Sequence, residues 1–434
     1  MTRSRRLRRF ALSSPLAIAA GLVAGPGQVA QAQSFDATST VVAGSASVIT
    51  NPGTTDIFVD STSAVINWVP NDTATGGGPI NFQPAATTAT FVSFQSEPAD
   101  YYVLNRILPT DSTRAVQFNG TVISQSGIGE GQLVPGGTVF FYSPGGIILG
   151  PTSIFDVGSL GLTTSSVPFN GATGDFLNLP SRMATFPTAN SGTSVVVSPG
   201  ASVTAHGPQA FLAMVAPSVS NAGSISVDGS AALVSADAAS ITFSPDGLFD
   251  IQVTSGTSAT GTTLLNSGTI TGSAGAGLAD SHRIYMVAVP KNDAITMAIS
   301  NGSQLGFAIA GAADTDGNVI VLSGGHDIAD GVISAPRSDG GGAGTVDIVT
   351  SGNNLDFTSY FESRATGSNQ FTVSAGTANF ASDALFFNGG TSFLNVAAAA
   401  AGTLNVAGSL IANGGVVAFG EGESVAAGDR IGSQ

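Results

Sequence analysis

Asn-Ala-Gly-Ser-Ile at residues 221–225 recurs as Asn-Ser-Gly-Thr-Ile at residues 266–270, and this repeated unit decides the fold class. A degenerate copy begins at Asn301, and Ala-Gly-Ser-Leu at 407–410 is a late echo. We expect the Gly to adopt positive φ at a corner, the Asn to bond into the turn and the Ile to enter an apolar column. A unit this short cannot bury its own apolar face, so successive coils must stack.

Strand-like runs of three or four residues surround the repeat, among them Val195–Val197 and Val319–Leu322. Each is followed within a few residues by turn chemistry, such as Pro199-Gly200 or Gly324-Gly325, and almost no segment has helical periodicity. Val203 lies one coil before Ile225 in this pattern. The sequence therefore predicts an all-β parallel β-helix (β-solenoid). An antiparallel β-sandwich is the alternative, but it favours longer strands and two-residue hairpin turns.

The first 32 residues have the three parts of a secretory signal peptide. Five arginines precede an apolar run over 10–23, and Ala30-Gln31-Ala32 is the small-x-small pattern before a cleavage site. The run is short and interrupted, which disfavours a membrane anchor. We expect cleavage after Ala32, and we expect no membrane span in the rest of the chain.

Charge and cysteine content exclude further classes. The whole sequence has a formal net charge of −15, and the signal segment contains five of the 13 basic residues but none of the 28 acids. The remaining chain is therefore still more acidic, which disfavours nucleic-acid and anionic-lipid binding. Cysteine is absent, so the core must supply stability without disulfides.

Six segments between residues 60 and 165 form an ordered series of motifs. They are Val-Ile-Asn-Trp at 65–68, Ile-Asn-Phe-Gln-Pro at 80–84, Val-Leu-Asn-Arg-Ile at 103–107, Asn-Gly-Thr-Val-Ile-Ser at 119–124, the glycine-rich run 137–150 and Phe-Asp-Val-Gly-Ser-Leu at 155–160. This order resembles the N-terminal secretion domain of the filamentous haemagglutinin family, the exported partner in two-partner secretion systems. The resemblance covers roughly residues 35–300.

Two short motifs carry the resemblance residue by residue. Asn105 and Arg106 match the family's Leu-Asn-Arg motif. Its Asn-Pro-Asn-Gly-Ile turn corresponds to residues 143–147, where Pro144, Gly146 and Ile147 match, while Ser143 and Gly145 stand in place of the two Asn. Both replacements keep turn-forming chemistry. These seven residues are the candidate secretion motif.

The resemblance implies a right-handed parallel β-helix and export through the periplasm of a Gram-negative type envelope. It also implies recognition by an outer-membrane pore-forming partner with periplasmic docking domains. We expect a secretion module over 33–300 and continuing solenoid repeats over 301–434, with the glycine-rich 339–344 stretch as a linker or protruding loop.

The expected role is that of a secreted or surface-displayed, adhesin-like exoprotein. A receptor on a host or neighbouring cell is a further partner class. The alternative is a structural component of the cell envelope or biofilm matrix without a dedicated pore, and an autotransporter passenger is a third possibility.

Catalytic and metal sites are not expected. Acidic polysaccharide lyases need clustered cations, and here the few basic residues are scattered. His326 and Asp327, with Asp330, form the densest polar cluster and are interpreted as solvated loop residues. Asp314 and Asp316 begin a calcium-loop pattern that lacks its final Glu, so a tight turn is favoured and calcium binding stays open.

The aromatic residues 101–102 and 140–142 have two interpretations. They can form an adhesive surface, or they can pack within the coils, which is favoured. We expect no cofactor.

Overall fold

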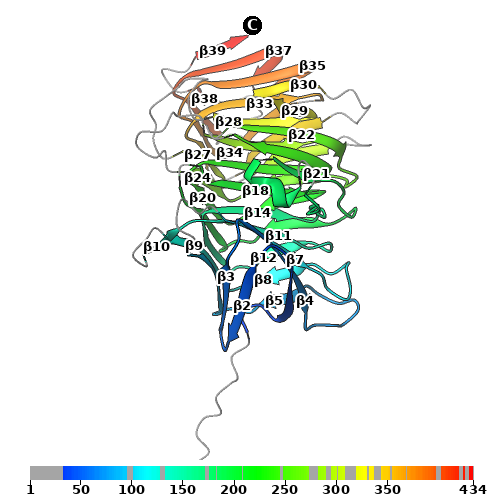
Figure 1. The fold of residues 1–434 in the computed structure, drawn as a ribbon. Helices are drawn as coiled ribbons and strands as arrows, with labels where there is room; N and C mark the ends of the chain where they lie inside the picture. The colour runs from blue at the N-terminus through cyan, green and yellow to red at the C-terminus, as the bar shows by residue number, and fades with distance from the viewer. Residues whose placement is uncertain are drawn as a thin grey trace, which may run out of the picture. The chain divides into compact units, whose positions relative to one another are not determined.

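The computed structural model describes residues 33–94, 101–127, 132–171, 175–181, 183–207, 209–244, 248–272, 282–289, 295–300, 302–307, 319–329, 332–336, 344–351, 354–367, 369–396, 402–419, 424–425 and 430–433. These residues form strands almost throughout, with one short 3-10 helix, η1 (Phe176–Ser181). Within these ranges no helix is long and apolar enough to cross a membrane. Residues 32–434 form one compact unit (Figure 1). The expected signal peptide, Asp314, Asp316 and Asp330 lie outside the described residues.

The strands form three faces of a parallel β-helix, with one strand per face in most coils. The first face contains β1 (Ala37–Ala43), β4 (Ser63–Pro70), β7 (Tyr102–Ile107), β11 (Thr138–Tyr142), β14 (Ser159–Thr163), β18 (Phe211–Ala216), the start of β21 (Ser230–Phe243), β25 (Arg283–Ala288), β28 (Val319–Gly324), β33 (Tyr360–Ala365), β35 (Ala384–Val396), β37 (Ser409–Phe419) and β39 (Arg430–Ser433).

The second face contains β2 (Ala46–Asn51), β3 (Thr54–Val59), β6 (Thr88–Ser93), β9 (Thr121–Gly127), β10 (Leu133–Pro135), β13 (Ile154–Val157), β17 (Ser202–Ala205), β20 (Ser224–Val227), β24 (Thr269–Gly272), β27 (Gln304–Phe307), β32 (Leu355–Phe357), the end of β34 (Asn369–Phe380), β36 (Gly402–Val406) and β38 (Ser424–Val425).

The third face contains β5 (Ile80–Gln83), β8 (Val116–Phe118), β12 (Ile147–Leu149), β16 (Ser194–Val197), β19 (Ser218–Asn221), β23 (Thr262–Asn266), β26 (Ile295–Ile299), β31 (Gly344–Ser351) and the start of β34.

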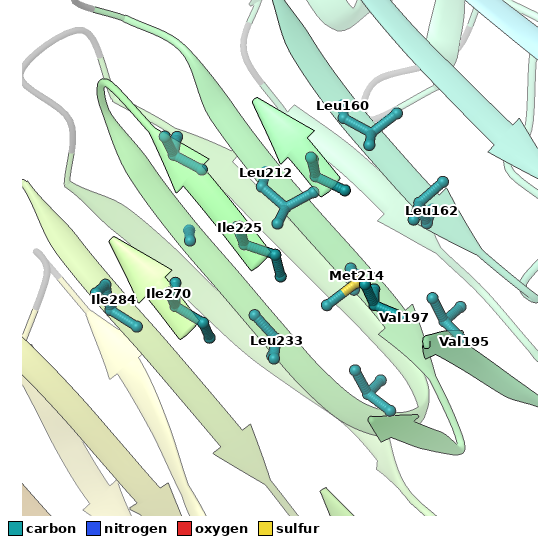
Figure 2. Packing of buried hydrophobic residues seen from close by; sticks show 14 of the residues in the cluster. Leu160, Leu162, Val195, Val197, Leu212, Met214, Ile225, Leu233, Ile270 and Ile284 are labelled. Atoms are coloured by element: carbon teal, nitrogen blue, oxygen red, sulfur yellow. The ribbon is translucent and has the colours of Figure 1, made fainter. Parts of the chain in front are cut away.

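A continuous buried column on the second face confirms the predicted stacking. Val203 pairs in parallel register with Ile225, and Ile225 pairs with Ile270. The full column consists of Thr55, Ala89, Val122, Phe155, Val203, Ile225, Ile270, Leu305, Phe357, Phe380 and Val406. Figure 2 shows how Leu212, Ile225 and Val197, one from each face, enter a shared apolar interior. The fold is therefore a parallel β-helix and not a sandwich.

The Asn of each repeat bonds as predicted, but the Gly does not take positive φ. The amide of Gly223 donates to Asn221 Oδ1 at 3.1 Å, and Asn221 Nδ2 donates to Asn266 Oδ1 of the next coil at 2.8 Å. Gly223 and Gly268 have ordinary φ values, so that prediction is wrong for both. A Cβ on Gly268 would lie 2.2 Å from the carbonyl oxygen of Gly223. These positions require glycine because the backbones of neighbouring coils approach closely there.

A second layer covers the outer side of the first face, and the sequence did not predict it. It consists of η1 and an antiparallel sheet formed by β15 (Met183–Phe186), the end of β21, β22 (Phe249–Gly256), β29 (His326–Ala329) and β30 (Val332–Pro336). A separate apolar cluster fills the space between this layer and the first face. Strands β18, β25 and β28 are consequently buried on both sides, whereas β16, β17 and β20 alternate between inward and outward residues.

Antiparallel strands and aromatic side chains close the N-terminal end of the stack. Strand β1 runs antiparallel to β4, and β2 runs antiparallel to β3 (Figure 1). The ring of Phe35 stacks on Phe82 at a centroid separation of 4.8 Å and meets Trp68 edge-on at 5.0 Å. All three side chains are fully buried. These three rings form an N-terminal floor, which closes the apolar interior at the first coil.

Candidate functional site

Asn105 is a structural part of the apolar interior. It lies on β7 with its side chain fully buried, and its Oδ1 accepts a hydrogen bond from Trp68 Nε1 at 2.9 Å. Its Nδ2 donates to the carbonyl oxygen of Phe140 at 3.2 Å, which links β7 to β11. A buried amide with both ends paired fixes the relative position of three strands. Its buried position leaves no surface for a partner protein to contact.

Arg106 points outward from the same strand. Its Nη1 donates to Asn67 Oδ1 at 3.1 Å, and its guanidinium lies over the half-buried Phe169 ring, 4.8 Å from the centroid. Burial lowers the pKa of Arg106 from its usual value, and neighbouring Tyr142 acts in the opposite direction. Arg106 is therefore a half-exposed cation held by an amide and an aromatic ring.

The 143–147 turn is shaped by its contact with the preceding coil. A Cβ on Gly145 would lie 2.1 Å from the carbonyl oxygen of Arg114, and Gly146 has a φ of +120°. The carbonyl of Gly146 accepts a hydrogen bond from the amide of Val116 at 3.0 Å. The exposed Asn190 donates to the carbonyl of Pro144 at 3.1 Å. The two glycines thus have different physical roles, close approach and backbone conformation.

Ser143 and Ile147 are both fully buried at the ends of this turn. Ile147 pairs with Val116 on one side and Val195 on the other, inside the third face. The Oγ of Ser143 finds no hydrogen-bond partner among the described residues.

The first half of the candidate motif lies on β7, and the second half is the turn that directly follows the adjacent strand β11. Arg106 is in register with Tyr142, which directly precedes Ser143. Asn105 is in register with Phe141. The structure therefore brings the two motifs to the same ends of β7 and β11, in coils close to the N-terminal floor.

An ion pair near this site was missed by the sequence analysis. Arg114 is 8% exposed and forms a bidentate contact with Asp72, at 3.0 Å to Oδ1 and 2.8 Å to Oδ2. It also donates to the carbonyls of Ala74 and Gly78, which holds the glycine-rich 71–78 loop against the coil. Hydrogen bonding to Arg114 lowers the pKa of Asp72. The sequence shows only that an Arg and an Asp are present, and it does not indicate that these two residues form an ion pair.

The interpretation of His326 and Asp327 as solvated loop residues is wrong. His326 lies in β29 of the second layer and is only 3% exposed. Asp327 accepts a hydrogen bond from the amide of Val253 at 3.0 Å. The antiparallel layer buries His326 because β29 packs over the first face, whereas Asp327 stays partly exposed.

Four of the five aromatic residues singled out in the sequence pack inside the protein, as favoured, while Tyr102 is partly exposed. Tyr101, Phe140 and Phe141 are essentially unexposed, and Tyr142 is 8% exposed. Tyr101 donates to the carbonyl of Phe91 at 2.9 Å, and burial raises its pKa. Within the described ranges, no group of three or more His, Cys, Asp or Glu could hold a metal ion.

The fold is that of a β-solenoid protein with a closed N-terminal end. No family model and no curated protein matches the sequence. The crystal structure of the HMW1 secretion domain from Haemophilus influenzae aligns over 91% of this chain and 99% of its own, at 16% identity and a TM-score of 0.47. The crystal structure of a filamentous hemagglutinin secretion domain aligns over 93% of this chain and 100% of its own, at 15% identity and a TM-score of 0.31.

Proposed function

We propose that this chain is the exported exoprotein of a two-partner secretion system, with residues 33–300 as its secretion module. One observation carries the proposal: the two sequence motifs that resemble the secretion domain lie side by side in the first coils, one at the end of β7 and the other in the turn after the adjacent strand β11. Asn105, Gly145 and Gly146 serve to build those coils. Arg106 is the cation of the motif and points outward. It is the residue of the motif best suited to contact an outer-membrane pore or its periplasmic docking domains.

The physical properties of the fold support passage through a pore in an unfolded state. A chain without cysteine is not trapped by disulfides in an oxidising compartment. A solenoid can fold at one end and then add coils one at a time, since each coil contacts only its neighbours. The closed N-terminal floor of Phe35, Trp68 and Phe82 provides a starting surface for such growth.

Outside the cell, the chain would act in adhesion or surface display and not as an enzyme. Stacked coils present long side surfaces with regularly repeated outward residues, which suits binding to a host or neighbouring cell. Chemistry on acidic polysaccharides would need clustered cations, and the chain is strongly acidic.

Export of the full chain with and without its pore tests this function. The chain is expressed in a Gram-negative host together with a candidate outer-membrane pore gene from its own gene neighbourhood, and separately without it. We expect extracellular protein beginning at Gln33 in the first case and periplasmic retention in the second. Equal extracellular yield in both cases would contradict the proposal and favour a structural envelope or matrix protein.

A further inference from the structure

A cavity of about 270 Å³ opens at the corner where the chain passes from the second face to the first. It spans three successive coils, at the turns before β11, β14 and β18. Phe243 and Ser244 at the end of β21, Phe249 at the start of β22 and Leu179 of η1 complete its walls. The cavity is independent of the candidate secretion motif, because none of the motif's residues lines it.

Glycines occupy the corners of three successive coils at this cavity, at residues 136–137, 158 and 207. A Cβ on Gly158 would lie 2.5 Å from the carbonyl oxygen of Gly137 in the coil before it. Gly137 and Gly207 have φ values of +81° and +113°. Gly158 is therefore required by the close approach of two coils, and Gly137 and Gly207 by their backbone conformation. The corner at Gly207 is open, because a Cβ there would meet no atom within 4 Å.

Aromatic rings from the first face and from the second layer pack together at this cavity. Phe211 and Phe243 stack with centroids 4.1 Å apart, and Phe243 meets Phe249 edge-on at 5.1 Å. Tyr102 of β7 contributes a fourth ring to the lining. These rings support one another, so their position does not depend on a ligand.

His206 stands at the rim in a fixed orientation. Its Nε2 lies 2.7 Å from Asp156 Oδ1, and its Nδ1 lies 3.8 Å from Asp228 Oδ2. Asp228 Oδ2 also accepts a hydrogen bond from the amide of Gly207 at 3.1 Å. The two carboxylates are thus already engaged, and no Asp, Glu, Lys or Arg lines the cavity. Neither an anion nor a cation would find an opposite charge among the lining side chains.

We propose that this cavity binds one neutral pyranose ring of a saccharide. A sugar ring has apolar C–H faces that suit the partly exposed Tyr102 and hydroxyl groups that suit His206, Gln209 and the backbone at Gly207. Ligand pockets combine apolar surface with a small number of oriented polar groups in this way. The volume is slightly below the roughly 300 Å³ where pockets for drug-sized ligands begin, so it fits a single ring.

Ligand-observed NMR on the purified mature chain tests this proposal. The probes are the methyl glycosides of glucose, galactose, mannose and N-acetylglucosamine, and the variants are Gln209→Trp, Tyr102→Leu and Gln304→Trp. Gln209 and Gln304 are both exposed, but only Gln209 lines the cavity. We expect saturable binding of at least one glycoside, at least tenfold weaker in Gln209→Trp and Tyr102→Leu and unchanged in Gln304→Trp. Thermal melting confirms that each variant is folded.

Two outcomes would overturn the proposal. One is saturable binding of no glycoside at millimolar concentration, or binding of an apolar probe such as p-cresol alone. The other is glycoside binding that Gln209→Trp leaves intact, which places the site elsewhere. The assay uses purified protein and needs no pore, so its result is independent of the proposed export.

Discussion

Asn105 illustrates how a polar residue can be essential inside an apolar core. Its amide satisfies the indole N–H of Trp68 and bonds to the strand that follows in the stack. Removing it leaves the buried Trp68 donor without a partner, and an unsatisfied buried group costs about 1–3 kcal/mol. Its role in the motif is therefore explained by folding of the first coils.

Asn105→Ala is expected to lower the free energy of unfolding by about 1–3 kcal/mol, because Trp68 Nε1 loses its acceptor. Urea denaturation followed by Trp68 fluorescence measures this directly, since the sequence has one tryptophan. Asn81→Ala is the matched control, as Asn81 is exposed and should change stability little. An unchanged midpoint for Asn105→Ala would show that this hydrogen bond is not needed for stability.

Gly145→Ala and Gly146→Val are both expected to destabilise the protein, for different reasons. The first forces a Cβ against the carbonyl of Arg114, and the second places a β-branched residue at a φ of +120°. Strain of the second kind costs on the order of 1–3 kcal/mol. Thermal melting is the measurement, and Gly78→Ala is the control, because Gly78 has open space around its Cα. Equal melting temperatures for all three variants would contradict this account.

At the residue scale, the sequence identified the important residues correctly but did not always give the correct physical reason for their importance. The motif singled out Asn105 and Gly146, and both are needed by local geometry. The repeat singled out Gly223 and Gly268, but their reason is contact between coils and not positive φ. Distances between coils depend on how the coils stack, and the sequence of a single coil does not specify this.

Strand type could be predicted at the scale of elements, but the second layer could not. Alternating runs such as Ser202–Ala205 form strands with one face buried and the other partly exposed. Runs such as Phe211–Ala216 are apolar at most positions, and the structure buries them on both sides. An apolar run indicates burial without indicating what covers it. The covering strands directly follow first-face strands in the sequence: β21 continues from the first face into the layer, and β29 follows β28.

His326 in the second layer should make the protein sensitive to mild acid. Burial, together with the nearby Arg364, lowers the pKa of His326 to about 4 from 6.5. Below pH 6.5 the unfolded chain binds a proton that the folded chain does not, so stability falls as the pH decreases toward 4. Each pH unit in this window is worth about 1.4 kcal/mol, which gives a total of at most about 3 kcal/mol.

The comparison of wild type with His326→Gln isolates this effect. Burial raises the pKa values of Glu362 and Asp347, and these groups act in the opposite direction over part of the same window. Urea midpoints are measured at pH 7 and pH 5 for both proteins. We expect the stability lost between the two pH values to be larger in wild type than in His326→Gln. Equal losses of stability in the two proteins would mean that His326 can accept its proton within the folded state.

For the whole molecule, one apolar column links the first coils to the last described ones. Thr55 at its start and Val406 at its end belong to the same line of parallel pairs. Each coil is stabilised only by its neighbours, so the stack depends on a well-formed first coil. This links the motif to export: variants that weaken the first coils are expected to weaken the folding that accompanies release outside the cell.

The most direct test of the account is the export of residues 1–300 alone, measured as the fraction of protein outside the cell with and without the pore. Residues 1–32 fused directly to 301–434 provide the control, which carries the signal segment without the proposed module. We predict that residues 1–300 are extracellular only when the pore is present and that the control stays in the periplasm in both cases. Export of residues 1–300 without the pore, or pore-dependent export of the control, would contradict the central claim.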